Sequence, residues 1–104
     1  MLNHRQLQNV GTKLKILCTT QQGAKPLTFV WFKDGAVLSD TVDRLKVDVF
    51  DEESVLIIQN LQFEDSGNYS CKAKNKFGFD VQYTIVSVQG LFWLFVLKFF
   101  LYLA

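Results

Sequence analysis

The stretch Asp65-Ser66-Gly67-Asn68-Tyr69-Ser70-Cys71 decides the fold of this 104-residue chain. Tyr69 stands two positions before Cys71. In a tyrosine corner, a Tyr at this spacing has a buried ring, and its hydroxyl bonds backbone a few residues upstream. The stretch therefore predicts the entry into a central strand of a two-sheet β-sandwich.

Upstream positions fit the same core. Trp31 follows Cys18 by thirteen positions, and a Trp so placed packs against a disulfide that joins the two sheets. The apolar residues Leu56, Ile58 and Leu61 recur shortly before the corner and point to the same core. The order and spacing predict an all-β fold, a two-sheet sandwich with Greek-key connections.

Apolar and polar residues alternate with a period of two along most of the chain. This alternation predicts strands over residues 13–18, 29–33, 44–49, 54–58, 68–75 and 79–88. Asp34-Gly35 is a strong tight-turn signal, and no stretch has a convincing helical period. The length of the chain is enough for one domain with a single sandwich core and too short for two.

The two cysteines lie 53 positions apart, and neither has a second Cys at zinc-ligand spacing. One structural bridge between Cys18 and Cys71 is expected, which would stabilise the fold by about 4 kcal/mol in the chain-entropy model. Such a bridge places the chain in an oxidising compartment. Two buried free thiols are the alternative.

Charge and residue content narrow the classes of function. Eleven Lys and Arg stand against ten Asp and Glu, and Lys98 lies in an apolar terminal segment, so residues 1–90 are balanced. This balance argues against nucleic acid as a partner, since phosphate neutralisation supplies most of that affinity. The single His is His4, and both cysteines are assigned to the bridge, so we expect no catalysis, no metal site and no cofactor.

Three segments carry a family resemblance: Trp31-Phe32-Lys33-Asp34-Gly35, Leu56-Ile57-Ile58-Gln59-Asn60-Leu61 and Cys71-Lys72-Ala73-Lys74-Asn75-Lys76-Phe77-Gly78. Through them the chain resembles an immunoglobulin domain of the intermediate set. Within that set it is similar to the Down syndrome cell adhesion molecule (Dscam) family, especially the amino-terminal domain of the shortened arthropod forms. The resemblance also implies an ion pair between Arg44 and Asp65; two separate surface charges are the alternative.

The resemblance implies a cell-adhesion module that recognises identical or related immunoglobulin domains, with roles in axon guidance and dendrite self-avoidance. It implies an extracellular or cell-surface location, although no secretory signal precedes the domain. A structural domain of an intracellular muscle-type protein is the alternative.

The chain divides into three segments in this interpretation. Residues 1–10 are expected to be a truncated first strand, and residues 11–90 the immunoglobulin-like domain. Residues 91–104 are almost wholly apolar but shorter than the about 20 residues of a spanning helix. They are interpreted as read-through or as a truncated membrane anchor, so a membrane contact through this tail or a parent chain stays open.

Several surface positions are candidate sites. Asn68-Tyr69-Ser70 fits the N-glycosylation pattern. Val30 and Phe32 are expected to face away from the core. The candidate interface further contains alternating lysines, which we place on one strand face with Lys33 nearby, and turn aromatics: Lys72, Lys74, Lys76, Phe77 and Phe79.

Acidic residues between positions 48 and 53 are expected to form the pole opposite these lysines, so that two copies dock antiparallel with each pole on the other. Solvated strand faces and a polar hairpin turn are the plainer interpretations of the two charged groups.

Overall fold

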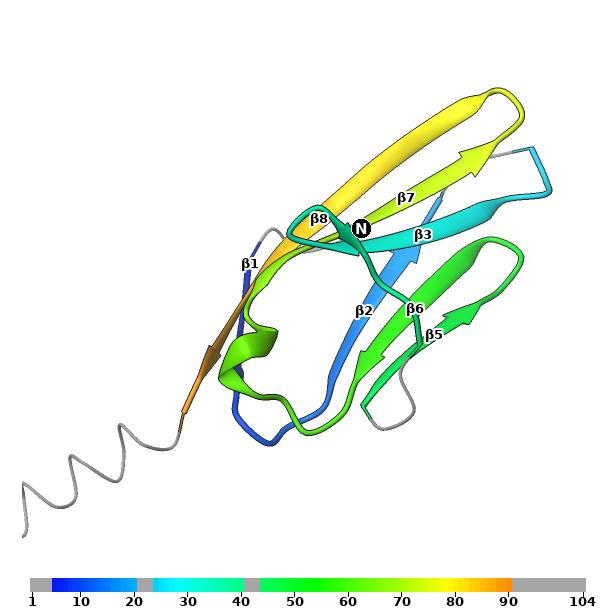
Figure 1. The fold of residues 1–104 in the computed structure, drawn as a ribbon. Coiled ribbons are helices and arrows are strands. Elements are labelled where there is room, and N and C mark those ends of the chain that lie inside the picture. The colour runs from blue at the N-terminus through cyan, green and yellow to red at the C-terminus, as the bar shows by residue number, and fades with distance from the viewer. Residues whose placement is uncertain (1–4, 21–23, 41–43, 91–104) are drawn as a thin grey trace, which may run out of the picture.

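Two β-sheets face one another in the computed structural model, which describes residues 5–20, 24–40 and 44–90 (Figure 1). The strands are β1 (Arg5–Asn9), β2 (Leu14–Thr19), β3 (Thr28–Lys33), β4 (Ala36–Val37), β5 (Leu45–Val49), β6 (Glu53–Ile58), β7 (Gly67–Asn75) and β8 (Gly78–Gln89). One turn of 3-10 helix, η1 (Phe63–Asp65), precedes β7. The interpreted tail, residues 91–104, lies outside the described residues.

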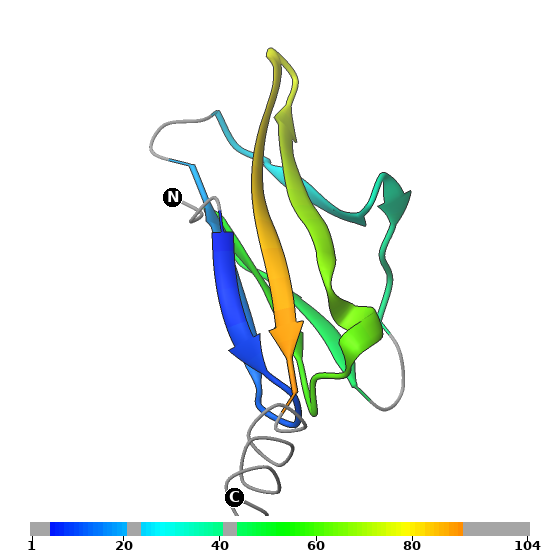
Figure 2. The same ribbon diagram turned by 90° about the vertical axis from the view of Figure 1, so that its left-hand side faces the viewer.

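The five-stranded sheet has the order β1-β8-β7-β3-β4, and the three-stranded sheet has the order β2-β6-β5. All described pairings are antiparallel except that of β1 with β8, which is parallel. Figure 2 shows β1 alongside β8 at the edge of the larger sheet. The predicted all-β sandwich of two sheets is confirmed.

Alternation along the strands builds the core. In β2, the side chains of Leu14, Ile16 and Cys18 are buried and those between them are exposed. The residues of the sequence signature all lie in the same buried cluster: Trp31, Leu56, Ile58, Leu61 and Tyr69. Burial of such side chains stabilises a fold by roughly 1.5–3 kcal/mol each.

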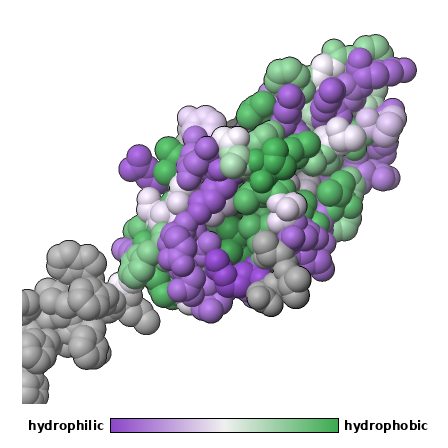
Figure 3. Space-filling model, in the orientation of Figure 1, coloured by the Kyte–Doolittle hydropathy of each residue, from purple (hydrophilic) through white to green (hydrophobic). Residues whose placement is uncertain are grey.

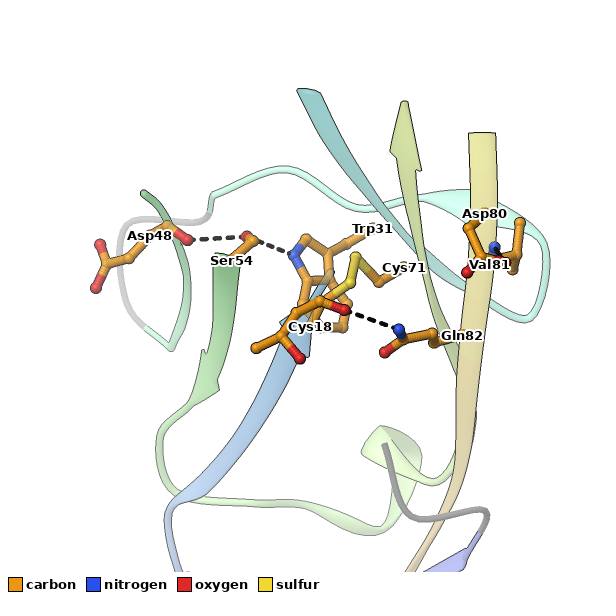
Figure 4. Close-up of a disulfide and its surroundings, with 9 residues drawn as sticks. Cys18, Trp31, Asp48, Ser54, Cys71, Asp80, Val81 and Gln82 are labelled. Atoms are coloured by element: carbon orange, nitrogen blue, oxygen red, sulfur yellow. Dashed lines mark hydrogen bonds between the residues drawn. A yellow bond between two sulfur atoms is a disulfide. The ribbon is translucent and has the colours of Figure 1, made fainter. Parts of the chain in front are cut away.

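A disulfide between Cys18 and Cys71 joins the two sheets at the centre of this core (Figure 4). The indole Nε1 of Trp31 donates a hydrogen bond to Oγ of Ser54 at 2.9 Å. The Ser54 hydroxyl in turn donates to the backbone oxygen of Asp48 at 2.8 Å. Trp31 and Ser54 lie in different sheets, so this chain of bonds is a second link across the sandwich.

The turn from β3 to β4 is tied to the start of β7. Asp34 and Gly35 both have positive φ, as a two-residue type I′ turn requires. The carboxylate of Asp34 accepts a hydrogen bond from the Asn68 N–H at 2.9 Å. A Cβ on Gly67 would lie 2.7 Å from this carboxylate, so glycine provides the space for it.

Ser54→Ala tests the link between Trp31 and Ser54. The substitution leaves the buried indole N–H without its acceptor, so we expect the free energy of unfolding to fall by about 1–3 kcal/mol, measured by urea denaturation. In a Trp31→Phe background the loss should be smaller, because no indole N–H remains. An equal loss in both backgrounds would contradict the assigned role of this bond.

Candidate interaction surface

The tyrosine corner fixes the entry to β7. The ring of Tyr69 is buried, and its hydroxyl donates to the backbone oxygen of Asp65 at 2.6 Å. Burial raises the pKa of Tyr69 well above its usual range, so the hydroxyl keeps its proton and remains a donor.

Arg44 and Asp65 are in direct contact below this corner. Nη1 of Arg44 lies 2.7 Å from Oδ2 of Asp65, and Nη2 lies 3.2 Å from Oδ1. The Gln62 N–H also donates to Oδ2, at 2.7 Å. Burial alone would raise the pKa of Asp65, but the hydrogen bonds from Arg44 and Gln62 outweigh it, so the pKa is lower than usual. The same bond with Asp65 raises the pKa of Arg44.

The outer face of the five-stranded sheet is the face of β3, β7 and β8 turned away from the core. On it, Lys72 lies between Val30 and Val81, which pair with it from the neighbouring strands. Ser70 lies in the same way between Phe32 and Tyr83. Val30 is exposed and Phe32 is half-buried, so both face away from the core.

The candidate lysines do not all lie on one strand. Lys72 and Lys74 belong to β7, but the strand ends at Asn75, and Lys76 lies in the turn to β8. The interpretation that Lys33 joins them is wrong. Lys33 pairs with Tyr69, on the core side of the sheet, and its Nζ bonds the backbone oxygen of Glu64.

Two lysines lie over phenyl rings at the end of the β7–β8 hairpin. Nζ of Lys72 is 4.2 Å from the ring centre of Phe79, and Nζ of Lys76 is 5.1 Å from that of Phe77. A cation over an aromatic face contributes about 0.5–1 kcal/mol at an exposed site. Both rings remain accessible to a partner surface, since Phe77 is 78% exposed and Phe79 is 64% exposed.

The acidic residues do not form a pole opposite the lysines. Glu53 pairs with Thr19, the last residue of β2, and Thr19 accepts a hydrogen bond from Gln82 of β8. The β5–β6 turn and the β7–β8 hairpin therefore lie at the same end of the sandwich, as Figure 1 shows. Both β2 and β7 run toward this end. Because the two charged groups share one end, they cannot act as the opposite poles of the expected antiparallel dimer.

Two exposed apolar residues next to Asp51 and Glu52 were not predicted from the sequence. Val49 and Phe50 are 56% and 54% exposed. Alternation would place Val49 on the core face with Leu45 and Val47, but the alternation in burial fails at this end of β5, which is an edge strand of its sheet. By contrast, the outward orientation of Val81 and Tyr83 on β8 could have been found by counting in twos from the buried Val86 and Val88, because alternation holds along this strand.

The remaining candidates are a glycosylation site, a metal site and a membrane-spanning segment. The Asn68 side chain is exposed at the start of β7, and its glycosylation stays a prediction. Among the described residues, no group of three or more metal-ligating side chains is found. Within the same ranges, no helix is long and apolar enough to cross a membrane.

The disulfide, the Trp packed beside it and the tyrosine corner define an immunoglobulin-type domain. The family described as "Immunoglobulin I-set domain" matches residues 2–88, and the chain belongs to this family.

Several curated proteins are similar to the chain. Fibroblast growth factor receptor-like 1 of Gallus gallus is 35% identical over 87 residues, which cover 83% of this chain and 17% of the relative. Junctional adhesion molecule A of Homo sapiens is 30% identical over 77 residues, 66% of the chain and 25% of the relative. Cell adhesion molecule DSCAM of Homo sapiens is 34% identical over 68 residues, 65% of the chain and 3% of the relative. The chain thus spans a quarter or less of these relatives.

These comparisons confirm the likeness to Dscam, at an identity similar to that of the other two relatives. The narrower likeness to an arthropod amino-terminal domain stays a prediction. Among solved structures, the titin I-band fragment I67-I69 matches with a TM-score of 0.79 at 24% identity, covering 86% of this chain and 31% of that one. A complex of titin M10 with an obscurin-like 1 immunoglobulin domain matches with a TM-score of 0.73 at 28% identity, covering 83% and 87%.

Asp65→Asn tests the electrostatics of the corner. At pH 7 the loss of the carboxylate should lower the free energy of unfolding by about 1.5–3 kcal/mol, because the three charge-assisted bonds from Arg44 and Gln62 are weakened. The pKa of Asp65 is lower in the folded chain, so its contribution is complete above the unfolded pKa of about 3.9 and is lost as the pH falls through the folded pKa. Urea denaturation should therefore show the two proteins converging in acid.

Asp80→Asn is the matched control, because Asp80 is exposed and, among the residues that the structure describes, its carboxylate accepts a side-chain hydrogen bond only from the neighbouring Val81 N–H. It should change stability little at either pH. A difference between Asp65→Asn and the wild type that stays constant down to pH 2 would contradict the lowered pKa.

Proposed function

We propose that this chain is a recognition domain of a cell-adhesion protein, and that it binds identical or related immunoglobulin domains in the manner of Dscam. Such homophilic binding would serve axon guidance and dendrite self-avoidance at the surface of cells. The observation that carries the proposal is the bridge between Cys18 and Cys71 in a chain whose relatives include two named adhesion molecules. A structural disulfide fits an oxidising, extracellular setting.

The distribution of ionisable groups supports binding rather than catalysis. Within residues 5–20, 24–40 and 44–90, the residues with shifted pKa values are Arg44, Asp65 and Tyr69, and each is engaged in the contacts of the corner. Several exposed apolar residues lie away from these contacts, with Val30 and Val81 on the outer face and Phe77 and Phe79 at the hairpin end, although Phe63 is exposed in η1 beside the corner. Exposed apolar groups beside charges are typical of a surface that contacts protein.

A structural role in an intracellular muscle-type protein is the second candidate. The likeness to the complex of titin M10 with an obscurin-like 1 domain favours it. Both candidates use the same sandwich, so the state of the two cysteines distinguishes them.

Self-association tests homophilic binding. Sedimentation velocity of the full chain at rising concentration should reveal a dimer, and beads coated with the chain should aggregate. A chain that stays monomeric throughout and leaves beads dispersed would refute homophilic recognition.

Mass spectrometry of the chain isolated from its native tissue, with free thiols blocked at lysis, tests the compartment. An extracellular domain should gain no blocking group until it is reduced, and reduction should add about 2 Da, one hydrogen per sulfur. Blocked Cys18 and Cys71 in the isolated chain would instead favour the intracellular role.

In the same spectra, a mass lost on glycosidase treatment would identify a glycan on Asn68, and an unchanged mass would contradict one.

A further inference from the structure

Two exposed surfaces share the end of the sandwich where β2 and β7 finish. The basic tip comprises Lys74, Lys76, Phe77 and Phe79 of the β7–β8 hairpin. The acidic turn comprises Val49, Phe50, Asp51 and Glu52, between β5 and β6. Every one of these eight residues is exposed. Figure 3 shows hydrophilic and apolar residues next to one another at this end of the molecule.

Each surface combines apolar area with charge, and the two charges are opposite. None of the ion pairs among the described residues involves Lys74 or Lys76. The acidic turn is only partly neutralised within the chain: Nζ of Lys25 lies 3.3 Å from Glu52 and 4.0 Å from Asp51, one cation for two carboxylates.

The surfaces belong to different sheets. The basic tip continues β7 and β8 of the five-stranded sheet, and the acidic turn joins two strands of the three-stranded sheet. The two surfaces therefore lie at the same end of the sandwich, on different sheets (Figure 1). No ion pair joins them among the described residues.

A pair of opposite surfaces at one end is complementary to itself under a twofold axis, since the same patch on two copies then brings each surface onto the other. We propose that two copies of this chain dock end to end, with the basic tip of each on the acidic turn of the other. The proposal rests on the homophilic function proposed above and names its surface. Phe77 and Phe79 meet Val49 and Phe50 in this arrangement, and the charges set the orientation.

Charge reversal tests this docking in sedimentation velocity on the full chain. Lys74→Glu with Lys76→Glu makes both surfaces acidic, and Asp51→Lys with Glu52→Lys makes both basic. Each double variant alone should dimerise at least about tenfold more weakly than the wild type, because like charges face each other at both contacts. An equimolar mixture of the two should dimerise again, since every contact then joins opposite charges.

Lys13→Glu with Lys15→Glu is the matched control. It makes the same change in net charge on exposed residues at the other end of β2, and its dimerisation should equal that of the wild type. Recovery in the mixture also shows that both variants are folded, because an unfolded chain would not restore the dimer.

The outcomes separate the docking surface from the function. A wild type that never associates overturns homophilic binding and this docking together. A wild type that dimerises, with either charge reversal having no effect or the mixture failing to recover, overturns the docking alone. Association through another part of the chain, residues 91–104 included, would leave all variants equal and so also count against it.

Discussion

The disulfide between Cys18 and Cys71 fixes which position of β2 faces which position of β7 across the core, and the other core contacts are arranged around it. Trp31 fills the space beside the bond and reaches across to Ser54 in the opposite sheet. A bridge over 53 positions removes much of the freedom of the unfolded chain, whereas the tryptophan contributes its packing only in the folded one. The two links therefore act on different states of the same equilibrium.

The tyrosine corner depends on the position that this bridge gives to β7. Tyr69 lies two residues before Cys71, so its ring enters the core on the same side of the strand. Its hydroxyl then holds the backbone of Asp65, and that residue's carboxylate holds Arg44 from the start of β5. The sandwich is thus joined by the covalent link in the middle of the core and by the polar contacts of Tyr69, Asp65 and Arg44 at the end where β7 begins.

The architecture could be predicted from the sequence because its causes are local or fixed by spacing. The alternation of Leu14, Ile16 and Cys18 identifies a buried strand face without any knowledge of its partners. Asp34-Gly35 identifies a tight turn by the conformation that its residues tolerate. These features keep their meaning whatever the rest of the chain does.

The arrangement of charges could not be predicted in the same way. Whether the acidic turn lies opposite the lysines or beside them depends on which ends of the two sheets coincide, and alternation carries no information on that. The exposure of Val49 has a similar origin, since it depends on the place of β5 at the edge of its sheet, which the unbroken alternation of the sequence does not reveal. The prediction that Lys76 shares a strand with Lys72 and Lys74 is wrong for a third reason, because β7 ends one residue before Lys76.

The parallel pairing of β1 with β8 has a mechanical consequence. Residues Arg5 to Asn9 align in order with Ile85 to Gln89, so the chain enters this pair at one end and leaves it at the other. Tension applied through the segments before Arg5 and after Gln89 would slide the two strands past one another, loading all their hydrogen bonds at once instead of opening them singly. Resistance to stretching would then be set by the rate of breaking this short patch, while the bridge between Cys18 and Cys71 would limit how far the chain could extend afterwards.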